Sequence, residues 1–200
     1  MVVRSVSGIA HGRSLRSRRG GFTLLELMVV MVIIGILSGI AFIKLDPRRN
    51  QADAGIGVVK TVMQQAMRNA VQRQYNIIVS FDTVGRRIRT VEDKNNNNVY
   101  DVGERALWRP LENDMKFSTP AQVVTGGLSP GPVIGSKIRT IDAMPSVIAR
   151  RDGALSSDLQ VFVTSLRGSP GDYRAVMVAQ PTGRVEVYWY TGSVWTAMLR

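Results

Sequence analysis

A long apolar run near the N-terminus constrains the fold of this chain more than any other feature. Residues 22–43 hold a single charged side chain, Glu26, and as an α-helix they would be roughly 33 Å long, enough to cross a bilayer core. Residues 1–21 contain five arginines and no acidic residue. Because the cytoplasmic flank of a membrane segment is enriched in arginine and lysine, this asymmetry predicts a cytoplasmic N-terminus and a single crossing.

Charge and composition exclude several classes of function. The net charge is +11, but five of these charges lie in residues 1–21, and residues 50–200 add only five because 18 basic residues there face 13 acidic ones. A mildly basic domain is weak support for nucleic-acid binding. The chain has no cysteine, and its only histidine, His11, lies in the basic leader. Disulfides and thiolate metal sites are therefore excluded, and we predict no enzyme because the body of the chain lacks the commonest general base.

The junction between leader and apolar run carries a more specific pattern. Residues 21–27 read GFTLLEL, with Gly21 after the basic leader, Phe22 at the start of the apolar run and Glu26 four residues later. This arrangement resembles the N-terminal signature of type IV pilins and type II secretion pseudopilins, in which the leader ends in glycine and the mature chain begins with phenylalanine and has glutamate as its fifth residue. The resemblance implies that a prepilin peptidase cleaves between Gly21 and Phe22 and methylates the new amine of Phe22.

The lone carboxylate in the apolar run needs an explanation. Within a bilayer such a charge costs roughly 2 to 4 kcal/mol, so it is usually paired or functional. On chemistry alone two explanations stay open: Glu26, one turn from Phe22, remains hydrated or protonated near the membrane interface, or it pairs with a cation. The resemblance implies the second explanation, with the N-terminal amine of a neighbouring subunit as the partner, and makes Glu26 the predicted assembly residue.

A second helical pattern follows the apolar run. Pro47 is typical of the first position of a helix, with Asp46 as its N-cap, so a helix is predicted to restart there. Apolar residues at three- and four-residue spacing then predict one amphipathic helix that packs on a sheet: Ile56, Val59, Val62, Met63, Ala66, Met67, Ala70, Val71 and Tyr75. Gly55 and Gly57 weaken its first turns, which indicates fraying or close packing between subunits, and we favour fraying.

Beyond Asn76 the pattern becomes that of short strands separated by turns. We predict strands at residues 76–82, 86–92, 106–108, 115–118, 146–149, 159–164, 173–179, 184–190 and 194–198, and an irregular connection over residues 120–145. The predicted fold class is α+β and pilin-like, a long N-terminal helix whose first half is transmembrane, packed on an antiparallel β domain. Its predicted parts are a cleaved basic leader (1–21), a transmembrane and assembly helix (22–45), an amphipathic continuation of the helix (46–75) and the β domain (76–200).

Short segments of the β region resemble those of GspH/FimT-type minor pilins and pseudopilins: an acidic, asparagine-rich hairpin, SLRGSPG at residues 165–171 and TGRV at residues 182–185. The resemblance implies a structural subunit of a type II secretion pseudopilus or a type IV pilus, with its C-terminal domain in the periplasm before it leaves the inner membrane for the fibre. The implied partners are other pilin or pseudopilin subunits, prepilin peptidase, the inner-membrane assembly platform and secreted substrate proteins. Two alternatives stay open: a DNA-binding minor pilin for DNA uptake, and a membrane-anchored periplasmic binding protein outside any fibre.

The asparagine-rich hairpin also has the spacing of an EF-hand calcium loop. Loop positions 1, 3, 5, 7, 9 and 12 are held by Asp93, Asn95, Asn97, Val99, Asp101 and Glu104. Asn98 replaces the usual glycine, and the flanks are predicted strands in place of helices. We therefore favour a turn whose polar side chains bond to their own backbone over a Ca²⁺ site, and Ca²⁺ is the only cofactor that the sequence suggests.

A last candidate site combines basic and aromatic residues near the C-terminus. Such a mixture can bind DNA through phosphate contacts and base stacking. The residues are Arg167, Arg174, Arg184, Tyr188, Trp189 and Trp195. Glu186 would repel phosphate, and the alternation of Val185, Val187 and Trp189 is typical of a strand that faces a core. We favour that strand, and nucleic acid is not an expected partner.

Overall fold

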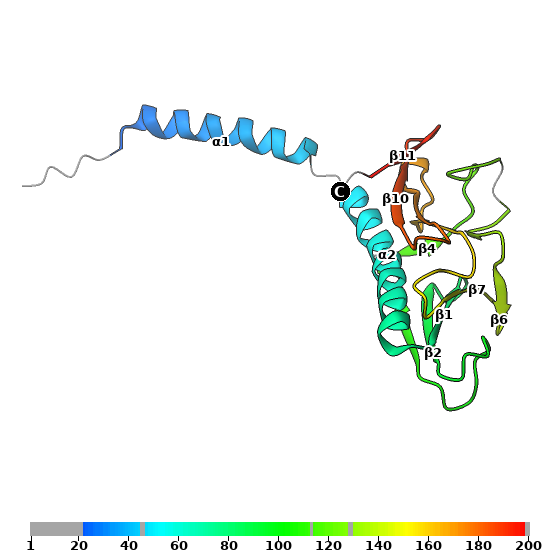
Figure 1. Ribbon diagram of the computed structural model, residues 1–200. Helices are drawn as coiled ribbons and strands as arrows, with labels where there is room; N and C mark the ends of the chain where they lie inside the picture. Colours follow the sequence, from blue (N-terminus) through cyan, green and yellow to red (C-terminus); the bar gives the residue numbers. More distant parts are fainter. Residues whose placement is uncertain (1–21, 45–46, 113, 128–129, 199–200) are drawn as a thin grey trace, which may run out of the picture. The chain divides into compact units, whose positions relative to one another are not determined.

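The computed structural model describes residues 22–44, 47–112, 114–127 and 130–198, with side chains left aside at residues 40–50. The chain divides into two compact units, residues 1–45 and residues 46–200, and each is described here by itself. Figure 1 gives the element labels. The predicted leader, including Gly21, and the predicted N-cap Asp46 lie outside the described residues.

The first unit contains helix α1 (Leu24–Lys44), so the helix predicted for the apolar run is confirmed. It is 21 residues long and carries Glu26 as the acidic residue of its first turn. Within the described parts of the chain, no helix has both the length and the apolar character needed to cross a membrane. The membrane crossing predicted for residues 22–45 therefore stays a prediction.

The second unit begins with helix α2 (Pro47–Arg73), and the predicted restart at Pro47 is confirmed. A proline suits the first helical position because its missing N–H would have no intrahelical acceptor there. After Arg73, Gln74 adopts a left-handed backbone conformation with φ of 59°, which turns the chain into the first strand. Most of the predicted apolar stripe is buried, but Val71 is 43% exposed.

Two antiparallel sheets follow α2, as the predicted α+β class requires. The first sheet has the strand order β3-β2-β1-β7-β6, and its strands are β1 (Asn76–Asp82), β2 (Arg87–Asp93), β3 (Ala106–Pro110), β6 (Arg139–Ile141) and β7 (Met144–Ala149). The second sheet has the order β11-β10-β9-β8-β4, with β5 also pairing with β8. Its strands are β4 (Met115–Phe117), β5 (Val133–Ile134), β8 (Leu159–Ser165), β9 (Arg174–Val178), β10 (Val185–Tyr190) and β11 (Trp195–Ala197). A short 3₁₀ helix, η1 (Pro170–Asp172), joins β8 to β9.

The prediction of an irregular connection over residues 120–145 is wrong in part, because β5 and β6 form within it. Both strands are too short, at two and three residues, to show a period-2 pattern in the sequence. The turn from β6 to β7 consists of Asp142 and Ala143, both with positive φ (49° and 61°), which matches the twist of a two-residue hairpin. The turn sequence is Asp-Ala, and alanine rarely adopts this conformation. The sequence therefore lacks the Asn-Gly or Asp-Gly pair that would have predicted a hairpin here.

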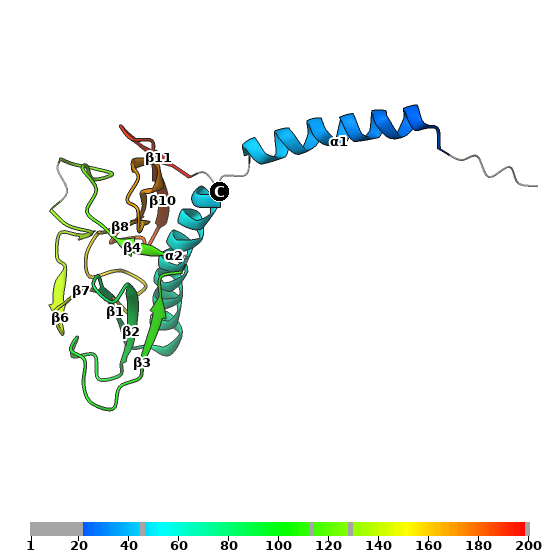
Figure 2. The same cartoon turned by 180° about the vertical axis from the view of Figure 1, so that it is seen from behind.

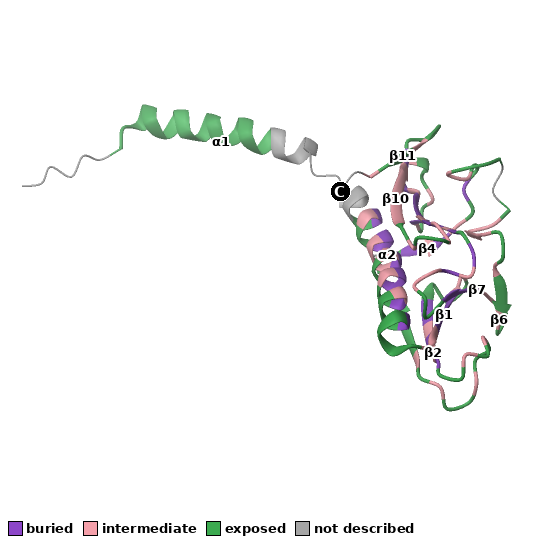
Figure 3. Ribbon diagram, viewed as in Figure 1, coloured by how far each residue is buried: buried purple, intermediate pink, exposed green. Residues whose placement is uncertain are grey.

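The core of the second unit lies between α2 and the two sheets. Figures 1 and 2 show α2 along one side of the strands, and Figure 3 shows its buried side turned toward them. One apolar cluster joins the helix to both sheets and includes Ile56, Met63, Phe81, Val147, Leu159 and Val176. This unit therefore buries a core of its own.

Because Gly55 has no side chain, helix α2 can lie close to the second sheet at this position. A Cβ added at Gly55 would lie 2.5 Å from Met115 Cγ on β4, whereas one added at Gly57 would meet nothing within 4 Å. Helix α2 is continuous through both glycines, so the expected fraying is wrong. The close packing at Gly55 occurs within the chain.

Candidate assembly segment

Helix α1 presents an apolar surface that no described residue of its own unit covers. Every described side chain from Phe22 to Gly39 is exposed. The large apolar ones are Phe22 (81% exposed), Leu24, Leu25, Leu27, Met28, Val29, Val30, Met31, Val32, Ile33, Ile34, Ile36 and Leu37. A helix that is apolar on all sides is stable only when protein or lipid surrounds it. This segment therefore needs lipid or protein from outside its own unit to cover it.

The first turn of α1 is capped by Thr23. Its Oγ1 accepts a hydrogen bond from the Glu26 N–H at 3.2 Å, and its carbonyl oxygen accepts one from the Leu27 N–H at 3.2 Å. The pattern Thr-x-x-Glu over residues 23–26 is that of a capping box, a local signal for the start of this helix. A carboxylate in this turn also interacts favourably with the partial positive charge of the helix N-terminus.

The carboxylate of Glu26 itself is exposed and has no ion-pair or hydrogen-bond partner among the described residues. It lies in the first turn, close in sequence to Phe22, the residue whose amine cleavage would release. An unpaired acid beside an apolar surface can accept a cation from another molecule without first breaking an internal contact. The pairing role of Glu26 stays a prediction.

Residues 93–104 form a turn whose side-chain oxygens bind its own backbone. Asp93 is fully buried, and its two carboxylate oxygens accept the N–H groups of Asn97 and Asn98 at 3.1 and 2.8 Å. The two oxygens of Glu104 accept the N–H groups of Lys94 and Asp101, both at 3.1 Å. The loop is thus held by bonds that need no ion.

The remaining predicted calcium ligands take part in the same network. Asn95 and Asn97 donate their side-chain amides to one oxygen of Asp101, at 2.8 and 2.6 Å, and the Asn97 side-chain oxygen accepts the Val99 N–H at 2.8 Å. Asn98 has a φ of 63°, the conformation for which an EF-hand uses glycine. No group of three or more His, Cys, Asp or Glu side chains able to hold a metal occurs in the described part of the chain. Calcium binding stays a prediction.

The three predicted DNA-binding arginines do not share one face. Arg174 is 2% exposed, and its Nε donates to Asp53 Oδ1 of α2 at 2.6 Å. Its Nη1 donates to the carbonyl oxygens of Gly171 and Tyr173, at 2.8 and 3.0 Å. Arg184 is exposed and pairs with Glu186 at 2.8 Å, while Arg167 lies exposed before η1. Arg174 is therefore a buried link to α2, whereas Arg184 and Arg167 are cations at the surface.

Strand β10 otherwise follows the alternative that the sequence favoured. Val185 and Val187 pack against the main core cluster, as predicted, and Trp189 on the same alternation is half-buried. On the other side of the strand, the Tyr188 hydroxyl donates to Glu186 at 2.7 Å, and this bond is the main reason why the pKa of Tyr188 is raised. Glu186 is thus shared between Arg184 and Tyr188, which reduces the positive charge that Arg184 can offer to phosphate.

Comparisons with solved structures find a limited likeness. Two structures of the minor pseudopilin EpsH from the type II secretion system of Vibrio cholerae match with TM-scores of 0.45 and 0.46 and sequence identities of 9% and 10%. The matches cover 68% and 70% of this chain and 95% and 94% of those chains.

Comparisons of sequence give a more direct result. Residues 16–42 match the family model of the prokaryotic N-terminal methylation motif. The pilin-like protein PilA1 of Thermus thermophilus is 34% identical over 87 residues, which are 43% of this chain. The chain spans about half the length of that relative, 56% of it. That relative carries the name of a pilin-like protein and not of an enzyme. The methylation motif and the pilin-like relative both support the resemblance of this chain to type IV pilins and pseudopilins.

Proposed function

We propose that the chain is a minor pilin or pseudopilin, a structural subunit that enters a type IV pilus or a type II secretion pseudopilus through α1. The observation that carries the proposal is the uncovered apolar surface of α1 beside the unpaired carboxylate of Glu26, within a methylation motif. In this proposal a prepilin peptidase cleaves between Gly21 and Phe22. The amine of Phe22 then becomes available to the Glu26 of a neighbouring subunit.

The free energy of assembly would come mainly from packing α1 against other pilin helices. Burying one large apolar side chain contributes roughly 1.5 to 3 kcal/mol, and α1 exposes many of them. A buried ion pair adds little net stability, because desolvation of both charges offsets their attraction. The Glu26 pair would instead fix the register of one helix against the next, the role best attested for isolated polar groups in apolar interfaces.

Before assembly, we propose, the apolar segment holds the chain in the inner membrane, with the N-terminus in the cytoplasm and residues 46–200 in the periplasm. The arginine-rich leader supports this orientation, since all five of its charges precede the apolar run. The assembly platform would then extract the subunit into the fibre. The second unit, which has its own core, would offer the surface specific to partner subunits or secreted proteins.

The processing step is tested by mass spectrometry of the chain isolated from the cell that makes it. The expected N-terminus is Phe22 carrying one added methyl group. Gly21→Val should block the cut because the resemblance puts Gly21 at the cleavage junction, while the matched control Gly20→Val, one residue away, should leave it in place. An uncut leader in the unaltered protein, or a cut elsewhere, would favour a membrane-anchored binding protein outside any fibre.

A further inference from the structure

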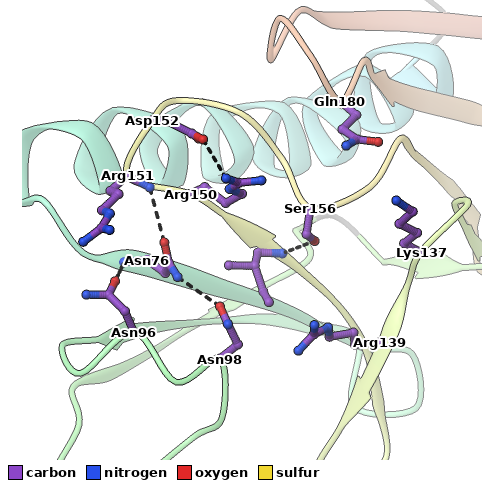
Figure 4. A pocket seen from close by; sticks show the side chains of 11 residues that line it. Asn76, Asn96, Asn98, Lys137, Arg139, Arg150, Arg151, Asp152, Ser156 and Gln180 are labelled. Carbon is purple, nitrogen blue, oxygen red and sulfur yellow. Dashed lines mark hydrogen bonds and ion pairs between the residues drawn. The ribbon is translucent and has the colours of Figure 1, made fainter.

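A basic pocket opens on the second unit between three segments that are distant in sequence. Its volume is about 620 Å³, and it lies among the asparagine-rich loop, the residues around β6 and the segment after β7 (Figure 4). Four cationic side chains line it, Lys137, Arg139, Arg150 and Arg151, against one carboxylate, Asp152. None of these residues belongs to the calcium or DNA sites that the sequence suggested.

The charge in this pocket is not balanced internally. Arg150 pairs with Asp152 at 2.9 Å, so these two side chains neutralise one another. Lys137, Arg139 and Arg151 are exposed, and none of their side chains has an ion-pair or hydrogen-bond partner among the described residues. Three like charges around one hollow repel one another, and the hollow concentrates their field. The arrangement therefore favours an anionic ligand.

The backbone under these cations is held in place before any ligand arrives. The N–H of Lys137 donates to Ser157 Oγ at 2.8 Å, and the N–H of Arg151 donates to Asn76 Oδ1 at 3.3 Å. Arg139 belongs to β6 and is paired with Ser146 of β7. Because these anchors are already formed, a ligand would need to order only the ends of the side chains.

The other lining residues indicate which kind of anion fits. Side-chain amides of Asn76, Asn96, Asn98 and Gln180 line the pocket. The side-chain oxygens of Asn96 and Asn98 already accept hydrogen bonds from Asn76, so these two residues offer their amide N–H groups, and Gln180 offers both a donor and an acceptor. No described lining residue is aromatic, so the pocket has no platform on which bases could stack. Strand β6 is the last strand of its sheet and offers a backbone edge to an extended segment.

We propose that this pocket binds an acidic segment of a partner protein, extended in conformation and carrying at least two carboxylates. The guanidinium groups of Arg139 and Arg151 and the ammonium group of Lys137 receive the carboxylates, and the surrounding amides bond to the peptide backbone. A nucleic acid is the weaker candidate, because it needs an extended basic track and not one confined hollow. The proposal does not depend on fibre assembly.

The test uses the full-length chain in detergent, which covers the apolar surface of α1. Fluorescence anisotropy at 0.15 M salt follows the binding of a labelled hexaglutamate peptide, with hexaglutamine as the uncharged probe. We expect saturable binding of hexaglutamate and none of hexaglutamine. The pocket variant K137Q/R139Q/R151Q should weaken binding about tenfold or more, since each lost charge-assisted bond is worth on the order of a fewfold to a hundredfold in affinity.

A charge-matched control separates the pocket from the overall basic charge. The control variant R68Q/R86Q/R109Q removes three exposed cations that also lack partners among the described residues and lie outside this pocket. It should change the affinity less than about twofold, because none of its three cations lines the pocket and exposed charges are partly screened at this salt concentration. Both variants change exposed side chains, and equal melting temperatures would establish that both remain folded.

Three results would overturn the proposal. The first is an absence of saturable hexaglutamate binding to the unaltered chain. The second is equal weakening by the pocket and control variants, which would make the attraction a property of net charge alone. The third is tighter, pocket-dependent binding of a twelve-nucleotide oligothymidylate than of hexaglutamate, which would assign the pocket to nucleic acid.

Discussion

Arg174 and Arg184 look alike in the sequence but have different roles in the structure. Arg174 is buried and joins β9 to α2 through Asp53, whereas Arg184 extends from the surface beside Glu186. The partner of Arg174 is 121 positions away in the chain, so no local pattern could have placed this arginine inside. The sequence could only show that both residues lie near a strand, which is why they were grouped as one candidate DNA site.

The difference predicts unequal costs of truncation. Arg174→Ala removes a nearly buried guanidinium and leaves Asp53 and two carbonyl oxygens without their donor, so it should lower the free energy of unfolding by about 2 to 4 kcal/mol. Arg184→Ala, the matched surface control, should cost less than about 1 kcal/mol. Urea unfolding of the two variants makes the comparison, and similar costs would contradict the buried role of Arg174.

Asp82 provides a pH-dependent contribution to stability. Its carboxylate accepts the Gly85 N–H at 2.7 Å and pairs with Arg87 at 2.8 Å, and these two bonds, the first more than the second, lower its pKa below the ordinary value of 3.8. A carboxyl group whose pKa falls on folding stabilises the native state above the unfolded pKa. That contribution is lost as the pH drops through the lower, folded pKa.

The expected result is a pH-dependent difference between the unaltered protein and Asp82→Asn. Unfolding free energies should differ most above about pH 5, where the carboxylate is ionised in both states. The difference should shrink as the pH falls below 3.8. A difference that stays constant from pH 6 to about pH 2.5 would mean that the charge of Asp82 contributes nothing.

At the scale of elements, the sequence predicted the helices and most strands because each has a regular pattern. Strand β1 was predicted with its observed bounds, and β2, β8, β9 and β10 with ends that differ by one or two residues. Strands β5 and β6 could not be predicted because neither has a regular pattern of its own. Each is held by pairing with another strand, β5 with β8 and β6 with β7. The cap at Thr23 has a local signal, the Thr-x-x-Glu pattern of residues 23–26, so it belongs to the features that a sequence can show.

Gly55 and Gly57 show why packing cannot be read from helix propensity. Gly55→Ala places a methyl group against Met115 on β4 and should cost about 1 to 3 kcal/mol in unfolding free energy through overpacking. Gly57→Ala meets open space and should stabilise the helix by up to about 1 kcal/mol. Thermal unfolding of the two variants should shift the midpoint in opposite directions. A stabilising Gly55→Ala would contradict the close contact between α2 and β4.

At the scale of the whole molecule, the chain separates an uncovered apolar helix from a unit that buries its own core. The helix of the apolar run could be predicted from the sequence because hydropathy is a local property, whereas the predicted leader lies outside the described residues. The basic pocket could not be predicted, since it joins residues near positions 76, 98, 139 and 151 that only the fold brings together. We propose that the first part serves assembly and the second serves partner recognition.

The central claim is that the subunit needs the charge of Glu26 to take its register in the fibre. Glu26→Gln removes the charge but keeps a residue that suits the third position of a capping box, whereas Thr23→Ala removes the cap but keeps the charge. The most direct measurement is the amount of each processed variant in purified fibres, relative to the amount in the membrane. We predict that Glu26→Gln is cleaved normally but is depleted from fibres about tenfold or more, because it leaves the amine of a neighbouring subunit as an unpaired charge in an apolar interface, while Thr23→Ala is incorporated nearly as well as the unaltered chain. Normal incorporation of Glu26→Gln would contradict the claim.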